Sequence, residues 1–213
     1  MSDTCRSLEE VAKDYYAGLV AVDDNIGRVL KHLEDKKLLD DTAIVQGSDH
    51  GYFLGEWRSF DKRFMHEPSI RVPLMIRYPK RIPAGTVRDE MVLDTDLAPT
   101  FLDLAGVPVP AHMQGKSVLP LVKEPDPSFR KEWYYEYYEW PNPESVRPHR
   151  GIRTERYKLI HYVMEPQEFE LYDLASDPGE TQNLYDQPQH QALQRDLLNR
   201  LEKLRANVPE RKV

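Results

Sequence analysis

The chain has 213 residues, of which 40% are hydrophobic and 31% are charged, a balance typical of a globular protein rather than a disordered one. Its single cysteine, Cys5, excludes an internal disulfide framework and a thiolate metal cluster. The net charge of −7 disfavours general nucleic-acid binding, and no apolar run approaches the length of a membrane span. We therefore expect no nucleic-acid partner and no membrane partner.

A long amphipathic helix is predicted to begin after Ser7. Ser7 and Glu10 have the spacing of a capping box, in which each residue satisfies a backbone N–H of the other. Apolar residues then recur at steps of three and four, which is the period of a helix with one buried face. They are Leu8, Val11, Tyr15, Leu19, Val22, Ile26, Val29 and Leu33.

Two short apolar runs after this helix predict strands. Residues 42–45 follow a turn-like pair of aspartates and are rich in β-branched side chains, and residues 72–78 end at a proline. Both are typical of buried strands in a parallel sheet. Two or three strands are few for such a sheet, so the α/β part looks incomplete. We therefore expect an exposed sheet edge and apolar helix faces that promote association.

The second part of the chain changes style. Asp96 can cap a short helix that ends before Gly106, and a proline-rich passage follows. Short strands are predicted at 133–140, 151–154, 157–162 and 169–172, and a final amphipathic helix after residue 188. The predicted fold class is α/β over residues 1–125, followed by a small antiparallel sheet packed with a C-terminal helix over residues 126–213.

The most informative residues for function come directly after the first predicted strand. Asp49 and His50 stand where the carboxyl end of a strand in an α/β sheet commonly meets a ligand. A carboxylate beside an imidazole can hold a divalent cation or transfer protons. The structural alternative is that Asp49 caps a turn while His50 packs locally.

A cluster of cations follows within about a dozen residues. Lys62 and Arg63 lie between Arg58 and Arg71 in the sequence, and Asp61 precedes them. Lysine and arginine near an Asp–His pair suit an oxyanion such as sulfate or phosphate. The structural alternative is a solvated charge run on a surface loop.

Taken together and in order, these motifs resemble the second half of a type I sulfatase, a member of the alkaline-phosphatase-like superfamily. The resemblance is strongest to the branch of the family that acts on sulfated sugars and glycosaminoglycans. The likeness begins near Tyr16 and continues to the final helix. The residues that carry it are Thr42-Ala43-Ile44-Val45-Gln46-Gly47-Ser48-Asp49-His50-Gly51, Leu54-Gly55-Glu56, Lys62, Glu67, Arg71-Val72-Pro73-Leu74, Asp96-Leu97-Ala98-Pro99-Thr100, Leu102-Asp103-Leu104-Ala105-Gly106, Gln114-Gly115-Lys116-Ser117, Arg153-Thr154-Glu155-Arg156-Tyr157-Lys158-Leu159-Ile160, Glu170-Leu171-Tyr172-Asp173-Leu174, Asp177-Pro178-Gly179-Glu180 and Asn183-Leu184.

The resemblance implies a sulfuric ester hydrolase that acts on sulfated carbohydrate. Residues 1–125 would be a remnant of its catalytic domain. Asp49 and His50 would be two ligands of a calcium ion, and Lys62 would contact the sulfate oxygens. The resemblance further implies sugar contacts by Asp61, and by His149 or Arg150 facing the same pocket.

One part of the family pattern is absent from this sequence. The family's nucleophile is a formylglycine made from Cys or Ser in a Cys-x-Pro-Ser-Arg setting, and Cys5 lacks that setting. The paired aspartates that complete the calcium site are missing too. We therefore expect the isolated chain to hydrolyse sulfate esters poorly and to bind calcium weakly.

Two other functions remain open on the sequence. The chain can be a phosphomonoester or phosphonate hydrolase of the same superfamily, or an inactive module that binds sulfated glycans without turnover. No signal peptide is recognised after Met1, and the sequence assigns no compartment.

Overall fold

A computed structural model describes residues 7–141 and 146–208 and divides the chain into two compact units. The first comprises residues 1–62 and 68–87, and the second residues 63–67 and 88–213. Cys5 lies outside the described residues. Over the described ranges, no helix has the length and apolar character needed to cross a membrane. The predicted division near residue 125 stays a prediction about domains.

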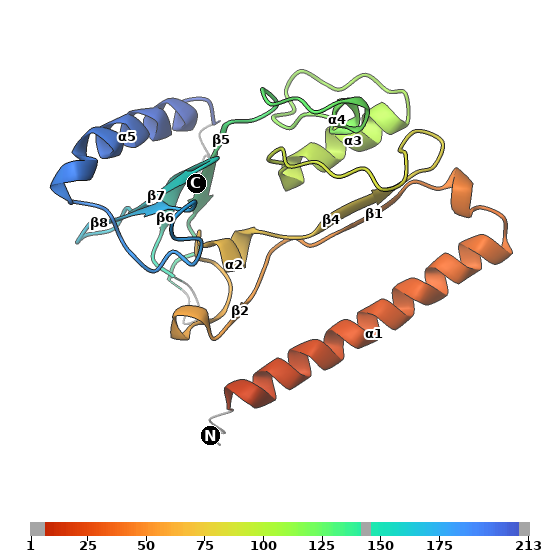
Figure 1. The fold of residues 1–213 in the computed structure, drawn as a ribbon, viewed down its shortest axis with the longest axis horizontal. Helices are drawn as coiled ribbons and strands as arrows, with labels where there is room; N and C mark the ends of the chain where they lie inside the picture. Colours follow the sequence, from red (N-terminus) through yellow and green to blue (C-terminus); the bar gives the residue numbers. More distant parts are fainter. Residues whose placement is uncertain (1–6, 142–145, 209–213) are drawn as a thin grey trace. The chain divides into compact units, whose positions relative to one another are not determined.

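The first unit begins with the predicted long helix, α1 (Leu8–Asp35), shown in red in Figure 1. The capping box is confirmed, since Glu10 N–H donates to Ser7 Oγ at 3.2 Å while Ser7 N–H donates to the Glu10 carboxylate at 2.8 Å. No residue of α1 is buried, although its sequence has a clear apolar face. Tyr16, for example, is 58% exposed and Val22 54% exposed.

Short elements complete this unit: η1 (Leu39–Asp41), β1 (Ile44–Gly47), β2 (Phe53–Leu54), η2 (Glu56–Arg58), β3 (Phe60–Asp61) and β4 (Leu74–Arg77), while α2 (Glu67–Ile70) runs across the boundary of the two units. The expected parallel pairing of the two apolar strands is wrong, because β1 and β4 pair antiparallel, with Ile44 opposite Arg77. Parallel neighbours need a long crossover, usually a helix. The chain between β1 and β4 instead holds two-residue strands and the four-residue α2.

An apolar groove runs between α1 and the β1–β4 ribbon. Its volume is about 820 Å³, and its lining includes Val22, Ile26 and Val29 of α1 together with Val45 of β1 and Met75 of β4. The ribbon has only two strands, so it leaves unpaired backbone groups at its edges. The exposed apolar face expected from the sequence is therefore present, while association through it stays a prediction.

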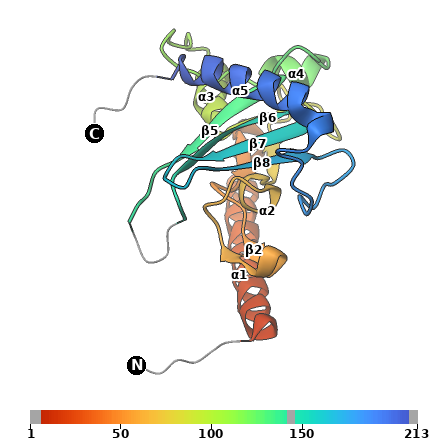
Figure 2. The ribbon, with the colours of Figure 1, turned by 90° about the vertical axis from the view of Figure 1, so that its left-hand side faces the viewer.

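The second unit contains two layers. Its sheet has the order β5 (Glu132–Tyr137), β6 (His149–Thr154), β7 (Tyr157–Tyr162) and β8 (Glu168–Asp173), and every neighbouring pair is antiparallel. The helix α5 (Gln191–Arg205) follows η4 (Pro188–His190) and lies across one face of this sheet, as Figure 2 shows from the side. The predicted antiparallel sheet with its C-terminal helix is confirmed.

The core of this unit lies between the sheet and α5. It consists of fully buried apolar side chains. Those from the sheet lie on one face of it, since every second residue of a strand points to the same face. They are Ile152, Leu159 and Leu171 from the sheet and Leu197 and Leu201 from the helix. Each is 0% exposed.

A helical segment, η3 (Asp94–Asp96), α3 (Leu97–Leu104) and α4 (Leu119–Lys123), precedes the sheet. The expectation that Asp96 caps α3 through its side chain is wrong, because its carboxylate makes no cap hydrogen bond to that helix. The two carboxylate oxygens instead accept hydrogen bonds from the Arg130 guanidinium at 2.7 and 2.8 Å. They also accept the backbone N–H groups of Leu93 and Lys116. A fully buried carboxylate is thereby satisfied on every side.

Candidate functional site

Three of the predicted site residues meet just beyond the end of β1. Lys62 Nζ lies 2.5 Å from His50 Nε2, and Asp49 Oδ1 lies 3.6 Å from the same imidazole nitrogen. His50 Nδ1 lies 2.7 Å from the carbonyl oxygen of Gly51. A carbonyl only accepts, so Nδ1 carries the proton and Nε2 accepts from the Lys62 ammonium. The tautomer of His50 is thus fixed by its own neighbouring backbone.

The loop that carries these residues packs closely on a following segment. Gly51 N–H donates to the carbonyl oxygen of Ser69 at 2.7 Å. A Cβ atom at Gly51 would overlap the carbonyl group of Pro68. Only glycine permits this approach of two backbones, so Gly51 fixes the path of the chain directly after His50.

The backbone around Lys62 is strained. Asp61 has a φ of 78° and Arg63 a φ of 91°, so residues in the left-handed region stand on both sides of the lysine. Residues other than glycine seldom adopt such values, and their presence costs free energy that the surrounding structure must supply. Such strain often accompanies functional sites, and here it determines how Lys62 leaves the β3 strand.

The segment after Lys62 lies against the sheet of the second unit. Met65 is 0% exposed, and a Cβ at Gly151 of β6 would overlap the Met65 sulfur. His66 Nε2 lies 3.3 Å from Glu170 Oε2 on β8. Tyr172 donates a hydrogen bond to the same carboxylate oxygen at 3.1 Å. Burial alone would raise the pKa of Glu170, but hydrogen bonds from His66 and Tyr172 lower it below its usual value.

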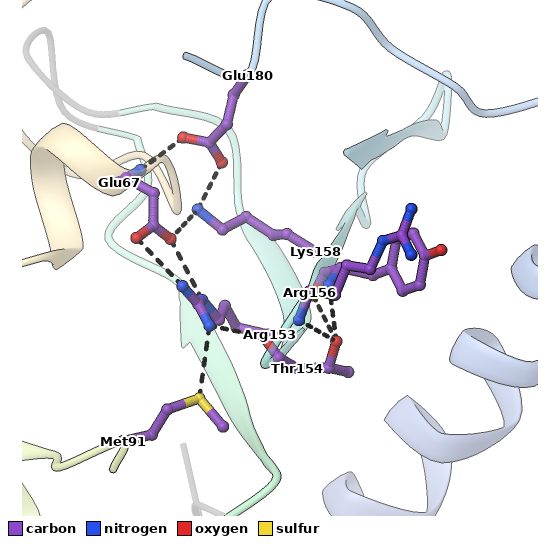
Figure 3. Close-up of polar contacts among 8 residues, drawn as sticks. Glu67, Met91, Arg153, Thr154, Arg156, Lys158 and Glu180 are labelled. Atoms are coloured by element: carbon purple, nitrogen blue, oxygen red, sulfur yellow. Dashed lines mark hydrogen bonds and ion pairs between the residues drawn. The ribbon is translucent and has the colours of Figure 1, made fainter. Parts of the chain in front are cut away.

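The next residue, Glu67, enters a network of buried charges (Figure 3). Lys158 Nζ lies 2.5 Å from Glu180 Oε1 and 2.9 Å from Glu67 Oε1, and the Lys158 side chain is 0% exposed. Glu67 N–H donates to Glu180 Oε2 at 2.7 Å, and Arg153 approaches the Glu67 carboxylate at 3.4 Å. Burial would raise the pKa of Glu67, but Lys158 and Arg153 lower it.

The two remaining predicted residues belong to the second unit and lie on opposite faces of β6. His149 is 0% exposed, its Nδ1 lies 2.9 Å from the Arg147 carbonyl oxygen, and its ring stacks on Tyr135 at 5.5 Å between centroids. Burial lowers the pKa of His149 to about 4, so the ring is neutral near pH 7. Arg150 instead pairs with Glu202 of α5 at 2.9 Å.

This alternation bears on the expectation that His149 or Arg150 faces the same sugar pocket as Asp61. Neighbouring residues of a strand point to opposite faces of a sheet. Arg150 shares its face with the α5 core, and His149 shares the other with Gly151, on which Met65 packs. Asp49, His50, Asp61 and Lys62 all belong to the first unit. The assignment of all six residues to substrate, metal or catalysis stays a prediction.

The buried cluster around Lys158 was not assigned a role from the sequence. Its residues appear in the family-like motifs, but nothing in their spacing brings positions 67, 158 and 180 together. A usable signal did exist: Lys158 interrupts the apolar run of residues 157–162, and a lysine inside a buried strand requires an acidic partner.

Asp49 and His50 fit part of a calcium site. A carboxylate oxygen is a ligand that Ca²⁺ prefers, and Asp49 is 87% exposed and available for coordination. His50 is the weaker match, because Ca²⁺ favours oxygen and because its Nε2 lone pair already accepts from Lys62. In the described ranges, no group of three or more His, Cys, Asp or Glu residues could hold a metal ion. Two ligands are fewer than the six to eight that Ca²⁺ takes.

Comparisons with known proteins identify the family. The family model described as N-sulphoglucosamine sulphohydrolase, C-terminal, matches residues 55–207, and the model described as Sulfatase matches residues 2–107. An N-acetylglucosamine-6-O-sulfatase from Bacteroides thetaiotaomicron is 46% identical over 197 residues, covering 91% of this chain and 35% of that protein. Human arylsulfatase K is 32% identical over 194 residues, covering 85% of this chain and 34% of that protein.

Comparison with solved structures gives matches over nearly the whole of this chain. A protein in complex with its substrate D-glucosamine-2-N,6-O-disulfate matches with a TM-score of 0.90 and 44% identity, over 97% of this chain and 43% of the other. A phosphonate monoester hydrolase of Agrobacterium radiobacter matches with a TM-score of 0.82 and 28% identity, over 93% of this chain and 42% of the other. The chain thus spans less than half the length of each of these relatives. Both family models and both sulfatase relatives lead to one conclusion: the chain belongs to the sulfatase family and corresponds to its C-terminal portion.

Proposed function

We propose that this chain contributes the sulfate-contacting lysine, and part of the saccharide and cation sites, to a sulfatase that hydrolyses sulfate esters of glucosamine-type sugars. The observation that carries the proposal is the Lys62–His50 contact of 2.5 Å beside Asp49. It occurs in a chain that is 46% identical to an N-acetylglucosamine-6-O-sulfatase. The chemistry of the contact suits an anionic ester, because an ammonium and a cation ligand stand together.

Lys62 is the proposed catalytic residue. Its ammonium carries three donors and a compact charge, so it can bind sulfate oxygens and stabilise negative charge as the ester bond breaks. The strained residues on both sides of Lys62 restrict the backbone that presents the ammonium. A donor held in a restricted position loses less conformational entropy when it binds the substrate. Lys62 is therefore better suited to this role than a lysine on a flexible surface loop.

Asp49 and His50 are the proposed calcium ligands of this chain. A bound calcium ion would supply positive charge that polarises the sulfate group. The Nε2 lone pair of His50 can serve either the Lys62 ammonium or a cation, but not both. Occupation of His50 by a cation would therefore release Lys62 to donate to the substrate. Further ligands and the formylglycine nucleophile would come from sequence other than this chain.

The saccharide contacts are proposed for Asp61 and His149. Asp61 precedes Lys62 directly, and its carboxylate is suited to accept hydrogen bonds from sugar hydroxyls. His149 Nε2 has no hydrogen-bond partner among residues 7–141 and 146–208, so a buried acceptor remains for a ligand or a water molecule. Arg150 is the weaker proposal, because its ion pair with Glu202 already neutralises its charge.

Ligand-observed NMR titration of the purified chain tests this function. We expect glucosamine-6-sulfate to bind more tightly than glucosamine, and Lys62→Met to abolish this preference while the protein stays folded. Glucosamine-6-phosphate is the third ligand, because tighter binding of the phosphorylated sugar than of the sulfated sugar would favour a phosphomonoester hydrolase. Equal binding of sulfated and unsulfated sugar by the unmodified chain would refute the proposed role of Lys62.

A further inference from the structure

The tip of the β2–β3 ribbon presents an aromatic ring and a guanidinium side by side in the sequence. Trp57 is 45% exposed, and Arg58 is exposed as well. The Arg58 side chain makes no hydrogen bond or ion pair with any residue in the described ranges 7–141 and 146–208. A tryptophan at this exposed tip offers apolar ring surface to a binding partner.

The tip is rigid rather than a loose surface loop. Gly55 N–H donates to Ser59 O at 3.0 Å, and Arg58 N–H donates to Gly55 O at 3.0 Å. Ser59 N–H donates to Glu56 O at 2.9 Å, and Leu54 N–H donates to the Glu56 carboxylate at 2.6 Å. These bonds close the ends of the tip on each other, so little conformational freedom remains to be lost when a ligand binds.

The backbone of the tip is also strained at the two residues in question. Trp57 has a φ of 58° and Arg58 a φ of 56°, in the left-handed region that favours glycine or asparagine. A turn alone would form with less strain if small residues stood at these positions. Two large side chains in this conformation are therefore explained better by a task at the surface than by folding of the tip.

The ribbon connects this tip to the proposed sulfate site within one unit. Phe53 pairs with Asp61 and Leu54 with Phe60, so β3 leads from the tip to Asp61, which directly precedes Lys62. With a rise of about 3.4 Å per residue, Arg58 lies at most about 14 Å and Trp57 at most about 17 Å along the chain from Lys62. This separation is of the order of two or three linked pyranose rings.

We propose that Trp57 and Arg58 form a saccharide subsite next to the one that presents its sulfate to Lys62. The Trp57 indole would stack on the apolar face of the neighbouring pyranose, and the Arg58 guanidinium would pair with an anionic group on that sugar. The ligand class is an anionic oligosaccharide rather than a monosaccharide. The assignment of the sugar register rests on the proposed function of Lys62.

The test compares two probes on the full chain by ligand-observed NMR titration: glucosamine-2-N,6-O-disulfate and a heparin-derived tetrasaccharide. We expect the tetrasaccharide to bind more tightly than the monosaccharide. Trp57→Ala should reduce this advantage about tenfold, the size of a lost aromatic contact, and Trp57→Phe should retain most of it. Arg58→Gln should weaken the salt dependence of tetrasaccharide binding.

Trp140→Ala is the matched control, because Trp140 is 46% exposed and belongs to the second unit. It should leave the affinities for both probes unchanged. An unchanged tetrasaccharide advantage in Trp57→Ala would overturn the subsite, even where Lys62→Met abolishes binding of the monosaccharide. Tetrasaccharide binding that depends on Trp57 but not on Lys62 would support the subsite and refute the proposed function. A wild-type chain that binds neither probe would overturn both.

Discussion

Replacement of Lys158 by methionine should destabilise the second unit strongly. Methionine nearly matches the length of the lysine stem but removes its charge. In the native protein, this ammonium lies 2.5 Å from Glu180 and 2.9 Å from Glu67, and the side chains of both Lys158 and Glu180 are 0% exposed. Lys158→Met would leave two carboxylates facing each other without the cation that joins them (Figure 3).

The magnitude follows from this burial. Removal of one partner from a buried ion pair typically costs about 3–5 kcal/mol, because the other charge stays buried without compensation. Arg153 remains near Glu67 at 3.4 Å, so Glu67 keeps one cation, and Glu180 carries most of the loss. We therefore expect a decrease in the free energy of unfolding near the lower end, about 3 kcal/mol.

Urea unfolding followed by circular dichroism measures this loss. The matched control is Lys131→Met, because Lys131 pairs with Glu155 at 2.8 Å but the two side chains are 51% and 62% exposed. Exposed pairs contribute about 0–1 kcal/mol, so the control should unfold nearly as the wild type does. The double variant Lys158→Met/Glu180→Gln should recover part of the loss. If Lys158→Met cost no more than the control, the cluster would not stabilise the fold as argued.

Three further predictions concern pH, packing and association. The Arg156 guanidinium holds the pKa of Asp173 at about 2, below the ordinary 3.8, so its stabilisation is present above about pH 3.8 and is lost as the pH falls towards 2; Arg156→Gln should flatten this part of a urea-midpoint profile. Gly151→Ala should lower the free energy of unfolding by about 1–3 kcal/mol, because the new methyl group would overlap the Met65 sulfur. Thermal unfolding measures this loss, and an unchanged midpoint would mean that the site relaxes around the methyl group. Val22→Lys, in the apolar groove, should reduce self-association in size-exclusion chromatography more than Val20→Lys, which lies outside the lining; equal effects would exclude the groove as the contact.

Local patterns predicted the local structure well. The strand 157–162 was predicted with the bounds that the structure has, and the capping box at Ser7 is present with both hydrogen bonds. Each signal lies within a few residues, so local geometry decides it. The pairing of β1 with β4 was wrong, because strand direction depends on the connection between strands and on the strands available, which a short apolar run does not report.

The same distinction applies to the candidate site. The sequence placed Asp49, His50 and Lys62 together by family likeness, and the structure brings them within hydrogen-bond or ion-pair distance. It did not separate His149 from Arg150, although the two-residue period of a strand makes opposite faces the default for neighbours. The partners that decide their surroundings, such as Glu202 on α5, come from elements more than fifty positions along the chain.

The segment that follows Lys62 gives the C-terminal sheet a role beyond covering a core. Met65 packs on Gly151, His66 pairs with Glu170, and Glu67 joins Lys158 and Glu180, so consecutive residues bind three different parts of the second unit. These contacts fix the backbone from residue 65 onward, while the strained Asp61 and Arg63 restrict it around Lys62 itself. A substitution in this sheet can therefore disturb the backbone of residues 65–67, which lies a few residues after the proposed catalytic lysine in the sequence. For this reason, losses of sulfate binding in variants of Lys158 or Glu170 must be read beside their unfolding curves before either residue is assigned to the site.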